Sequence, residues 1–456
     1  MLFMVKIGLE IHGYINTNEK LFCRCKTIHG LKFSKPNTNI CPVCTSQPGS
    51  KPLLPNEVAL DKAIQIALIL NCKVNEKLTW QRKHYDWPDN PKGYQSTISG
   101  SHAIPVGVKG EFLGINITEA HLEEDPAAWN PKTGEIDYNR SGLPLIEIVT
   151  DPDFSSSEQV VDWLKQLVLT LSYIKALDKN AGIKADVNIS LPEFKGERVE
   201  VKNVNSLKNI KTVIETEIIR QKADVPKFQE TRMFDEAKGI TIKMRSKEHA
   251  QDYRFISEPD LPVLNISKLK IEKIKKQLPE TPQEKLSKLI KQYNIEKKYA
   301  EVLIKKIDIA EFFEKILGKV DTKLACSWTV VELQRILNYN KKEIDEVDIN
   351  PEHFIELIKL IETKKITELK AKEILNKFIP KSFSPAKEAE LNSKISSEDE
   401  LTVACKEIIK ENPVPVKDYQ SGKQEALNFL IGKVMQKTNK RADFKTTREV
   451  LERFLK

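Results

Sequence analysis

The stretch from Asp137 to Asp153 limits most strongly what this chain can fold into. Its apolar run 145–149 is typical of a strand buried on both faces, yet Glu147 stands in the middle of that run. A buried carboxylate is costly unless a cation, a metal ion or several hydrogen-bond donors compensate it. For an isolated glutamate, a core strand with one edge-facing acid would be the ordinary explanation. Two segments upstream favour a functional site instead.

These two segments have strand composition and carry polar groups of the same kind. In residues 5–15 the side chains alternate between faces, so Glu10 and His12 share one face. The segment 115–125 ends in three consecutive acids. Three acidic strands would repel one another without a counter-ion, and oxygen-rich ligands with one imidazole suit Mg²⁺ or Mn²⁺ better than zinc. The pattern predicts an acidic divalent-metal site on a β-rich scaffold.

Four cysteines form two close pairs. Fifteen residues separate Cys23 and Cys25 from Cys41 and Cys44. This spacing is typical of a four-cysteine tetrahedral zinc site, and four buried unligated thiols are the alternative. Because protein would fill all four positions, no coordination site would stay open for catalysis. We therefore expect a structural zinc ion.

The sequence carries no sign of a membrane or secretory protein. No segment approaches the roughly 18 continuous apolar residues of a membrane span. The first predicted strand begins almost at the N-terminus, which leaves no room for a signal peptide. We expect a cytoplasmic protein without membrane association. There, the seven cysteines are more readily thiols or metal ligands than disulfides.

The net charge of +8 is unevenly distributed along the chain. Residues 266–456 hold 39 basic and 31 acidic residues, so the preceding part is neutral. A lysine-rich excess fits contact with a polyanion through its phosphates. It fits a lysine-biased composition equally well, and charge alone does not establish RNA binding.

The elements expected in the first part alternate between helices and strands. Residues 56–71, 155–177 and 206–222 have the apolar spacing of helices, and residues 184–191 and 198–206 alternate as strands do. These patterns predict a sheet with helices packed on it.

The character of the chain changes after about residue 264. Glycine becomes scarce, lysine abundant, and helical patterns continue to about residue 379. A breaker-rich link follows at 380–385, and further helices are expected from about residue 386. The predicted fold class is therefore α+β, a β-rich N-terminal domain followed by an all-helical C-terminal region.

The familiar nucleotide-binding loops are absent from the sequence. It contains neither a Gly-x4-Gly-Lys-[Ser/Thr] loop nor a Gly-x-Gly-x-x-Gly following a strand. Any nucleotide would bind through side chains and strand ends. The loop 82–94 is dense in aromatic and cationic residues, which can stack on bases and pair with phosphates. A packed, proline-stiffened surface loop explains it equally well.

Three motifs follow one another along the chain. They are Gly8-Leu-Glu-Ile-His12, His121-Leu-Glu-Glu-Asp125 and Tyr138-Asn-Arg-Ser-Gly-Leu-Pro-Leu-Ile-Glu-Ile-Val149. Together they resemble the B-subunit family of the tRNA-dependent amidotransferase GatCAB, and the likeness runs in order over nearly the whole chain. The resemblance implies a cradle-shaped domain that uses ATP and Mg²⁺ outside the usual nucleotide folds.

The resemblance also implies a division of the chain and a set of partners. Residues 1–264 would form the catalytic cradle with a zinc knuckle at 23–44, residues 265–379 a helical domain, and residues 386–456 a tRNA-binding tail. The partners would be a glutaminase A subunit and a small C subunit in a heterotrimer, together with misacylated tRNA. The cognate aminoacyl-tRNA synthetase is a further candidate partner.

The activity implied by the resemblance is a carbon–nitrogen ligation. ATP would phosphorylate the side-chain carboxylate of Asp-tRNA(Asn) and/or Glu-tRNA(Gln). Ammonia from glutamine, hydrolysed by the A subunit, would then displace the phosphate. The sequence holds no serine- and glycine-rich nucleophile segment with an appropriate lysine, so an autonomous amidase is disfavoured. The rival hypothesis is a non-catalytic tRNA-binding adaptor subunit.

The resemblance places roles on individual residues. His12, Glu124 and Glu147 are the expected Mg²⁺ ligands, and Glu10 is close enough to ligate the ion or to orient His12. Arg140 is either a phosphate ligand or an ion-pair partner of the strand acids. The residues expected to grip ATP or the aminoacyl end are Arg82, Lys83, Lys92, Asp186, Lys202, Arg232, Arg254 and Glu258.

The chain departs from the usual family pattern at four places. Pro126-Ala127-Ala128 replaces a usual Ala-Gly-Lys, Lys184 stands for a usual arginine, Gln251 for a usual aspartate, and Ser257 for a usual proline. These departures concern the nucleotide side of the expected site. They leave the metal-binding set untouched.

Overall fold

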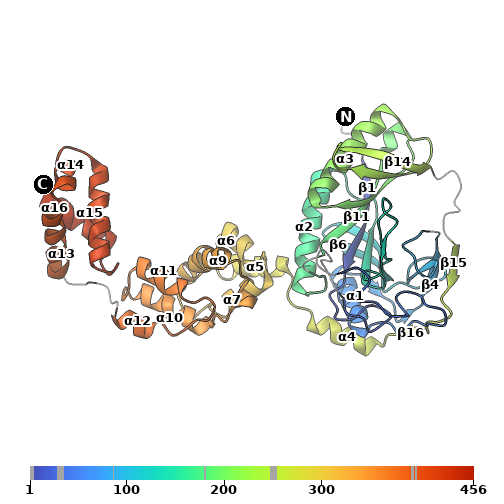
Figure 1. The fold of residues 1–456 in the computed structure, drawn as a ribbon, viewed down its shortest axis with the longest axis horizontal. Coiled ribbons are helices and arrows are strands. Elements are labelled where there is room, and N and C mark those ends of the chain that lie inside the picture. The colour runs from blue at the N-terminus through green and yellow to red at the C-terminus, as the bar shows by residue number, and fades with distance from the viewer. Residues whose placement is uncertain are drawn as a thin grey trace. The chain divides into compact units, whose positions relative to one another are not determined.

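The computed structural model describes residues 5–27, 35–85, 87–178, 181–246, 254–391, 395 and 398–455. The chain divides into two compact units, Met1–Glu280 and Thr281–Lys456, which we describe separately. The first unit combines a sheet with helices, and the second is helical (Figure 1). The predicted α+β class is therefore confirmed.

The elements of the first unit have the following bounds. Its strands are β1 (Lys6–Tyr14), β2 (Lys73–Val74), β3 (Lys77–Leu78), β4 (Gln81–His84), β5 (Tyr94–Thr97), β6 (Gly107–Phe112), β7 (Ile115–Glu124), β8 (Ala128–Trp129), β9 (Ile136–Asp137), β10 (Pro144–Thr150), β11 (Ile183–Ser190), β12 (Val199–Asn205), β13 (Glu230–Asp235), β14 (Ile240–Ser246), β15 (Arg254–Ser257) and β16 (Leu264–Asn265). Its helices are α1 (Glu57–Ile69), α2 (Ser157–Tyr173), α3 (Leu207–Ala223) and α4 (Lys268–Gln277).

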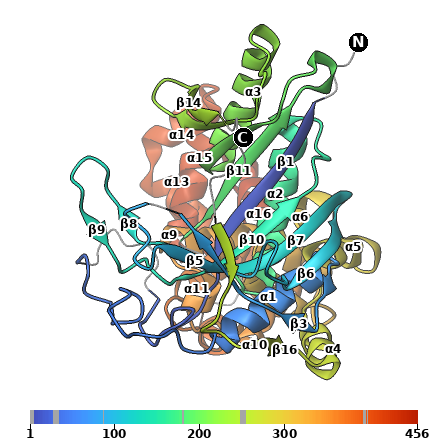
Figure 2. The same cartoon turned by 90° about the vertical axis from the view of Figure 1, so that its right-hand side faces the viewer.

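One large sheet organises this unit, in the order β14-β13-β12-β11-β1-β10-β7-β5-β4-β15. β1 lies between β11 and β10 near the middle of the sheet, as Figure 2 shows. The antiparallel register sets His12 opposite Glu147, and Glu147 opposite His121 on β7. The three acid-bearing segments expected from the sequence are therefore neighbouring strands.

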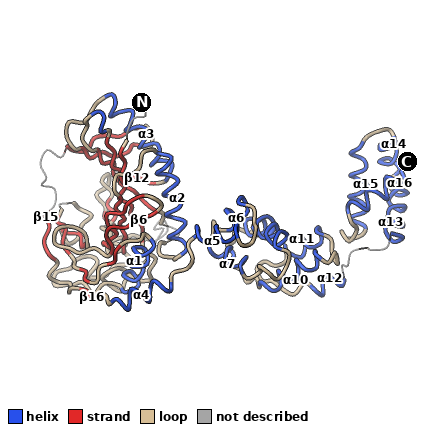
Figure 3. Tube along the Cα trace, turned by 180° about the vertical axis from the view of Figure 1, so that it is seen from behind, coloured by secondary structure: helices blue, strands red, loops and turns tan. Residues whose placement is uncertain are grey.

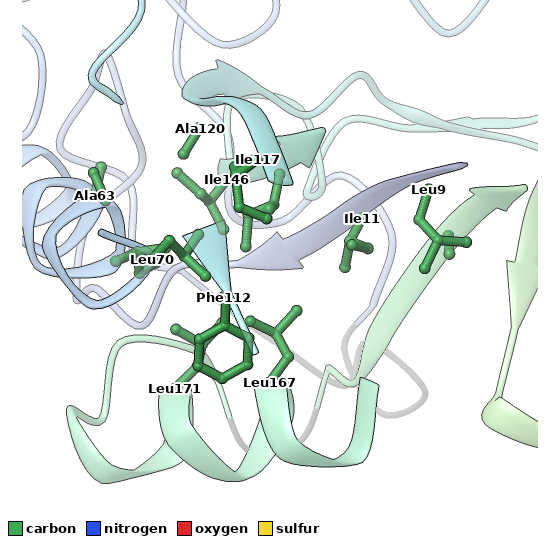
Figure 4. Close-up of a cluster of buried hydrophobic side chains, with 14 of the residues drawn as sticks. Leu9, Ile11, Ala63, Leu70, Phe112, Ile117, Ala120, Ile146, Leu167 and Leu171 are labelled. Atoms are coloured by element: carbon green, nitrogen blue, oxygen red, sulfur yellow. The ribbon is translucent and has the colours of Figure 1, made fainter. Parts of the chain in front are cut away.

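The two faces of the sheet differ in chemistry. Side chains alternate along β1, so Leu9 and Ile11 enter an apolar core while His12 points to the other face. Helices α1 and α3 pack against the sheet, and side chains of α1 and α2 join the same core (Figure 4). Each fully buried leucine or isoleucine there contributes about 1.5–3 kcal/mol. Because the helices cover the apolar face, the polar face is left for chemistry.

The second unit is built from α-helices of six to fourteen residues. The helices are α5 (Pro282–Lys291), α6 (Lys297–Leu303), α7 (Ile307–Glu314), α8 (Thr322–Ser327), α9 (Gln334–Tyr339), α10 (Pro351–Glu362), α11 (Glu368–Asn376), α12 (Ala386–Leu391), α13 (Glu398–Glu411), α14 (Pro413–Gln420), α15 (Gln424–Lys437) and α16 (Phe444–Leu455). Helices α13 to α16 pack on one another around their own apolar core (Figure 3). Among the described residues, no helix combines the length and the apolar character needed to cross a membrane.

Helix α4 lies in the first unit, although its sequence belongs to the lysine-rich part of the chain. It packs against α1, where Lys270 forms a 2.6 Å ion pair with Asp61. The compact first unit thus extends past residue 264. The three-part division of the chain stays a prediction.

Candidate functional site

A cavity of about 920 Å³ lies against the polar face of the sheet. Strands β1, β7, β10, β11 and β12 contribute to its wall, together with the loop after β4 and the β8–β9 hairpin. Its lining residues include His12, Tyr14, Lys83, Tyr85, Trp87, Asp89, Glu123, Asp125, Trp129, Arg140, Lys184, Asp186 and Lys202.

His12, Glu123 and Glu147 form a group that could hold a metal ion. One ligand atom of each lies within 4.8 Å of the other two. His12 Nε2 is 3.4 Å from Glu147 Oε2 and 3.9 Å from Glu123 Oε1. Burial alone would lower the pKa of His12, but the hydrogen bond with Glu147 and the nearby carboxylates raise it to about 9. A histidine held among buried carboxylates shows that this spot favours a cation.

His121 connects this group to a further glutamate. Its Nε2 lies 3.1 Å from Glu147 Oε2, and its Nδ1 lies 3.1 Å from Glu119 Oε1. Ser99 donates a hydrogen bond to Glu119. Burial would raise the pKa of Glu147, but the charges of His121 and His12 hold that pKa well below its usual value. Glu147 is therefore kept as an oriented carboxylate. Sequence reasoning assigned no role to His121 or Glu119.

The structure does not bring Glu124 together with His12 and Glu147. The Glu124 carboxylate pairs with Lys92 and accepts a 2.9 Å hydrogen bond from the backbone N–H of Ser96. The neighbouring Glu123 lines the cavity instead. Adjacent residues of a strand point to opposite faces, so only one of the two glutamates can reach the cavity.

A second acidic group, Glu10, Asp186 and Glu200, lies on the neighbouring strands. Lys202 Nζ is 2.8 Å from Asp186 Oδ2 and 2.5 Å from Glu200 Oε1. The ammonium group of this lysine therefore offsets part of the negative charge of the three acids. Asn188 donates a 3.0 Å hydrogen bond to Glu10. Burial, followed by repulsion from Glu147, raises the pKa of Glu10.

The residues expected to bind ATP or substrate divide into two sets. Lys83, Arg140, Asp186 and Lys202 line the cavity. Arg140 already contacts Asp125, at 3.2 Å from its Nε, and two backbone carbonyls. The expected residues that do not line this cavity are Arg82, Lys92, Arg232, Arg254 and Glu258. Gln251 lies outside the described residues.

Arg82 and Arg232, which do not line the cavity, have partners of their own. Arg82 makes two hydrogen bonds to Glu258, of 2.9 and 2.7 Å, and a third to Asp260. Arg232 contacts Glu230 at 2.9 Å and Glu217 at 3.4 Å. These arginines act in ion pairs within the fold.

The four cysteines come together as their spacing predicted. One sulphur atom from each of Cys23, Cys25, Cys41 and Cys44 lies within 4.8 Å of the others. Burial, with repulsion from Cys44, raises the pKa of Cys25 to about 11, whereas a hydrogen bond with Cys23 lowers the pKa of Cys44 to about 5. Four sulphur donors at this separation fit a structural metal ion.

The cysteine cluster is joined to the segment that precedes β10. Lys20 Nζ donates 3.2 Å hydrogen bonds to the carbonyls of Asn39 and Tyr138. Ser141 Oγ donates to the carbonyl of Cys44 at 2.8 Å. Because Arg140 lies between Tyr138 and Ser141, the cluster supports one wall of the cavity.

Comparison with known proteins gives two matching family models. The model described as "GatB/GatE catalytic domain" matches residues 5–272, and the model described as "GatB domain" matches residues 311–455. Three similar relatives are each named as the B subunit of an aspartyl/glutamyl-tRNA(Asn/Gln) amidotransferase. The protein from Methanocaldococcus jannaschii is 46% identical over 98% of this chain and 97% of its own length. Those from Methanopyrus kandleri and Methanothermobacter thermautotrophicus are 43% and 42% identical, over 98% of this chain and 98% and 99% of their own.

Proposed function

This chain belongs to the GatB/GatE family, and from that premise we propose that it is the B subunit of an ATP-dependent, glutamine-hydrolysing tRNA amidotransferase. Its substrate would be Asp-tRNA(Asn), Glu-tRNA(Gln) or both. It would work in the cytoplasm with a glutaminase A subunit and a small C subunit. The observation that carries the proposal is the His12–Glu123–Glu147 group beside a large cavity with lysines on its wall.

The chemistry requires activation because a carboxylate does not react with ammonia when oxide would have to leave. In the proposed reaction, an oxygen of the side-chain carboxylate attacks the γ-phosphorus of ATP and ADP leaves. The nitrogen of ammonia then attacks the acyl carbon, and phosphate leaves with that oxygen. Phosphoryl transfer depends mostly on positioning and on neutralising charge.

The proposed metal ligands are His12, Glu123 and Glu147, with Glu123 in place of Glu124. When bound there, Mg²⁺ would supply the positive charge that phosphate oxygens need. His121 holds Glu147 in place through its 3.1 Å contact. Oxygen donors with one imidazole are a suitable set for this ion.

The cavity wall offers cations for the phosphates and for the aminoacyl end. We assign this role to Lys83 and Lys184, which line the cavity. Arg140 is assigned to shaping the wall instead, since Asp125 and two carbonyls engage its guanidinium. Lys202 is engaged by Asp186 and Glu200.

We propose roles for the remaining parts of the chain on the same premise. Residues 1–264 carry the chemistry, with a structural zinc ion held by the knuckle at 23–44. Residues 265–379 form a helical domain, and residues 386–456 contact tRNA. The cognate aminoacyl-tRNA synthetase is a further candidate partner. The four gathered sulphurs and the lysine-rich terminal helices support these assignments.

The alternative function is a tRNA-binding adaptor without chemistry of its own. An adaptor has no need for buried carboxylates gathered around a histidine, because such groups are costly to bury. The metal-binding group therefore favours the enzyme.

The test uses two adjacent glutamates that point to opposite faces. In the complex reconstituted with the A and C subunits, we expect Glu123→Gln and Glu147→Gln to reduce tRNA-dependent phosphate release and amidation by on the order of 100-fold. Glu124→Gln, whose side chain pairs with Lys92, should retain most of the activity. Filter binding should show nearly unchanged tRNA affinity in all three.

Each variant is assayed with Asp-tRNA(Asn) and Glu-tRNA(Gln) separately. Full amidation by both Glu123→Gln and Glu147→Gln would rule out the proposed site and favour the adaptor. The same assay on the wild-type complex identifies which misacylated tRNA is the substrate.

A further inference from the structure

Two tryptophans meet at the wall of the cavity. Trp87 follows β4, and Trp129 lies on β8 in the hairpin formed with β9. Their rings pack edge to face, with centroids 5.5 Å apart and an angle of 67° between the planes. Both residues line the cavity that contains His12 and Glu123.

These two tryptophans differ from the other three in the chain. Trp80, Trp163 and Trp328 are buried in the protein interior, with 3–5% of each residue exposed. Trp87 is 50% exposed, although tryptophan carries a large apolar surface whose burial is favourable. An exposed aromatic ring on a cavity wall is suited to stack on a flat ligand, which buries apolar surface of both partners.

The surrounding contacts tie together the two backbone segments that carry these rings. The backbone N–H of Ala127 donates a 2.7 Å hydrogen bond to the carbonyl of Asp89, which ties the Trp87 loop to the start of the hairpin. Arg140 donates to the carbonyl of Ala127 at 2.5 Å and so supports the same junction. The segments that carry Trp87 and Trp129, the two residues that define the platform, are therefore held side by side, and the edge of one ring packs on the face of the other.

The chemistry beside the platform indicates what kind of ring would bind. Asp89 also lines the cavity, and its Oδ1 has no hydrogen-bond partner among the described residues. A carboxylate accepts hydrogen bonds from an exocyclic amino group, which adenine carries. Lys83 and Lys184, elsewhere on the same wall, suit phosphates. A flat base with an amino group and an attached phosphate chain matches all of these groups.

We propose that Trp87 and Trp129 form a stacking platform for an adenine base. The proposal rests on the proposed function, in which the two substrates offer adenine from different sources. ATP carries it directly, and the aminoacylated 3′ end of tRNA terminates in adenosine. Stacking on an aromatic ring recognises the base whatever group is attached to it, so both sources fit the platform. The experiment therefore tests ATP and the tRNA end separately.

The experiment measures equilibrium binding to the complex reconstituted with its A and C subunits. The probes are ATP, inorganic triphosphate, a short RNA ending in CCA, and the same RNA without its terminal adenosine. The variants are Trp87→Leu and Trp129→Leu, with Trp87→Phe as the conservative change that keeps an aromatic ring. Tyr339→Leu, which removes an 86% exposed aromatic ring from the second unit, is the matched control.

We expect both leucine variants to weaken binding of one adenine probe by on the order of tenfold or more. Binding of the probe that lacks adenine should stay unchanged, and Trp87→Phe should recover most of the affinity. A loss of affinity that is confined to ATP assigns the platform to the nucleotide. Loss confined to the CCA-ending RNA assigns it to the tRNA end. Either result supports the proposal.

Two results would overturn the proposal. One is unchanged affinity for ATP and for the CCA-ending RNA in both leucine variants. The other is equal weakening of the probes with and without adenine, because the tryptophans would then only maintain the fold. Amidation by the wild-type complex is measured in parallel. A complex that binds adenine through the platform but does not amidate would contradict the proposed function alone.

Discussion

At the scale of single residues, Lys20 shows how the four-cysteine cluster, which could hold a metal ion, is built into the fold. Only 1% of this lysine is exposed, and its ammonium group donates to two backbone carbonyls. Carbonyl dipoles alone compensate a buried charge poorly. Four thiolates around a divalent ion keep a net negative charge. The hydrogen bond with Cys23 lowers the pKa of Cys44, and the positive charge of Lys20 lowers it further. Lys20 is thus suited to be the counter-ion of the cysteine cluster.

The first prediction concerns the charge of this lysine. Lys20→Met should weaken zinc binding by about 10- to 100-fold, the usual cost of losing a residue that supports metal ligands. Competition with a chromophoric chelator measures the affinity, and elemental analysis gives the zinc content of the wild type. Lys51→Met is the control, because Lys51 lies close to the knuckle in sequence but its side chain is 70% exposed. Equal zinc affinity in Lys20→Met and wild type would argue against the counter-ion role.

The adjacent residues Glu123 and Glu124 show what could not be predicted for single residues, namely which of the two faces the cavity. Ile115 and Ile117 enter the core, so counting by two along β7 places Glu124 on the cavity face. The pairing of β7 with β10 shifts register where Val149 pairs with Glu119 and Thr150 with Ile117. One extra residue on β7 reverses the alternation, as a β-bulge does. The strand, its acids and their pairing with His12 were predictable, whereas a bulge has no sequence signal here.

At the scale of elements, the β13–β14 hairpin is attached to helix α3 by one buried carboxylate. The Glu217 side chain is completely buried and lies 2.9 Å from Arg220 on its own helix. From the hairpin, Thr241 donates a hydrogen bond to it, and Arg232 approaches to 3.4 Å. Burial would raise the pKa of Glu217, but the hydrogen bonds from Arg220 and Thr241 outweigh it and lower the pKa.

The second prediction concerns the stability that this carboxylate provides. Glu217→Gln should lower the free energy of unfolding of the first unit by about 3 kcal/mol at pH 7, because it takes the anion from the half-buried Arg220 and leaves Glu230 as the carboxylate partner of Arg232. The folded pKa lies below the unfolded value of 4.5, so the stabilisation is fully present above about pH 4.5 and is lost as the pH falls through the folded pKa. The difference between variant and wild type should therefore shrink in acid.

Urea unfolding followed by tryptophan fluorescence, at pH 7 and at pH 4, measures this difference. Glu215→Gln is the control on the same helix, since the Glu215 side chain is 49% exposed and exposed pairs contribute little. A difference that stays constant between the two pH values would show that charge is not the cause.

Periodicity predicted the elements of this region but not their contacts. The helix expected at 206–222 is α3 (Leu207–Ala223), and the strand expected at 198–206 is β12 (Val199–Asn205). Arg232 was expected to bind ATP or substrate, yet it lies among Glu217, Glu230 and Thr241. Which face of a short strand meets a helix depends on long-range packing, and a single arginine carries no signal for it.

At the scale of the whole molecule, the chain separates its chemistry from its positive charge. The groups that could hold a metal ion and the cavity lie in the first unit, and the excess of basic residues follows residue 265. The sequence predicted this separation, since strands and acids precede a lysine-rich helical part. It did not indicate that α4 belongs to the first unit, because a surface helix carries the same lysine-rich pattern in either place. A phosphate backbone is the partner that such a basic surface fits.

The last prediction tests whether the terminal helices α13–α16 bind tRNA through their charge. Deleting everything after Ser421 would remove α15 and α16, whose Leu427 and Leu451 belong to the shared apolar core, and would uncover that core. Removing exposed charges is therefore the cleaner change. Lys406 and Arg453 both lie over the ring of Phe454, at 4.9 and 5.3 Å from its centroid, and form one basic patch.

We expect the double variant Lys406→Gln/Arg453→Gln to raise the KM for tRNA and leave the KM for ATP unchanged. Each lost phosphate contact should also reduce the slope of log affinity against log salt by roughly 0.7–0.9, so the slope should fall by about 1.4–1.8. Filter binding between 50 and 200 mM salt measures this slope. The double variant Lys319→Gln/Lys381→Gln removes two lysines of the same unit that pair with acids, and it should leave the slope as it is. Equal slopes for all three proteins would mean that the patch is solvated surface, because counter-ions are released only where a phosphate replaces them.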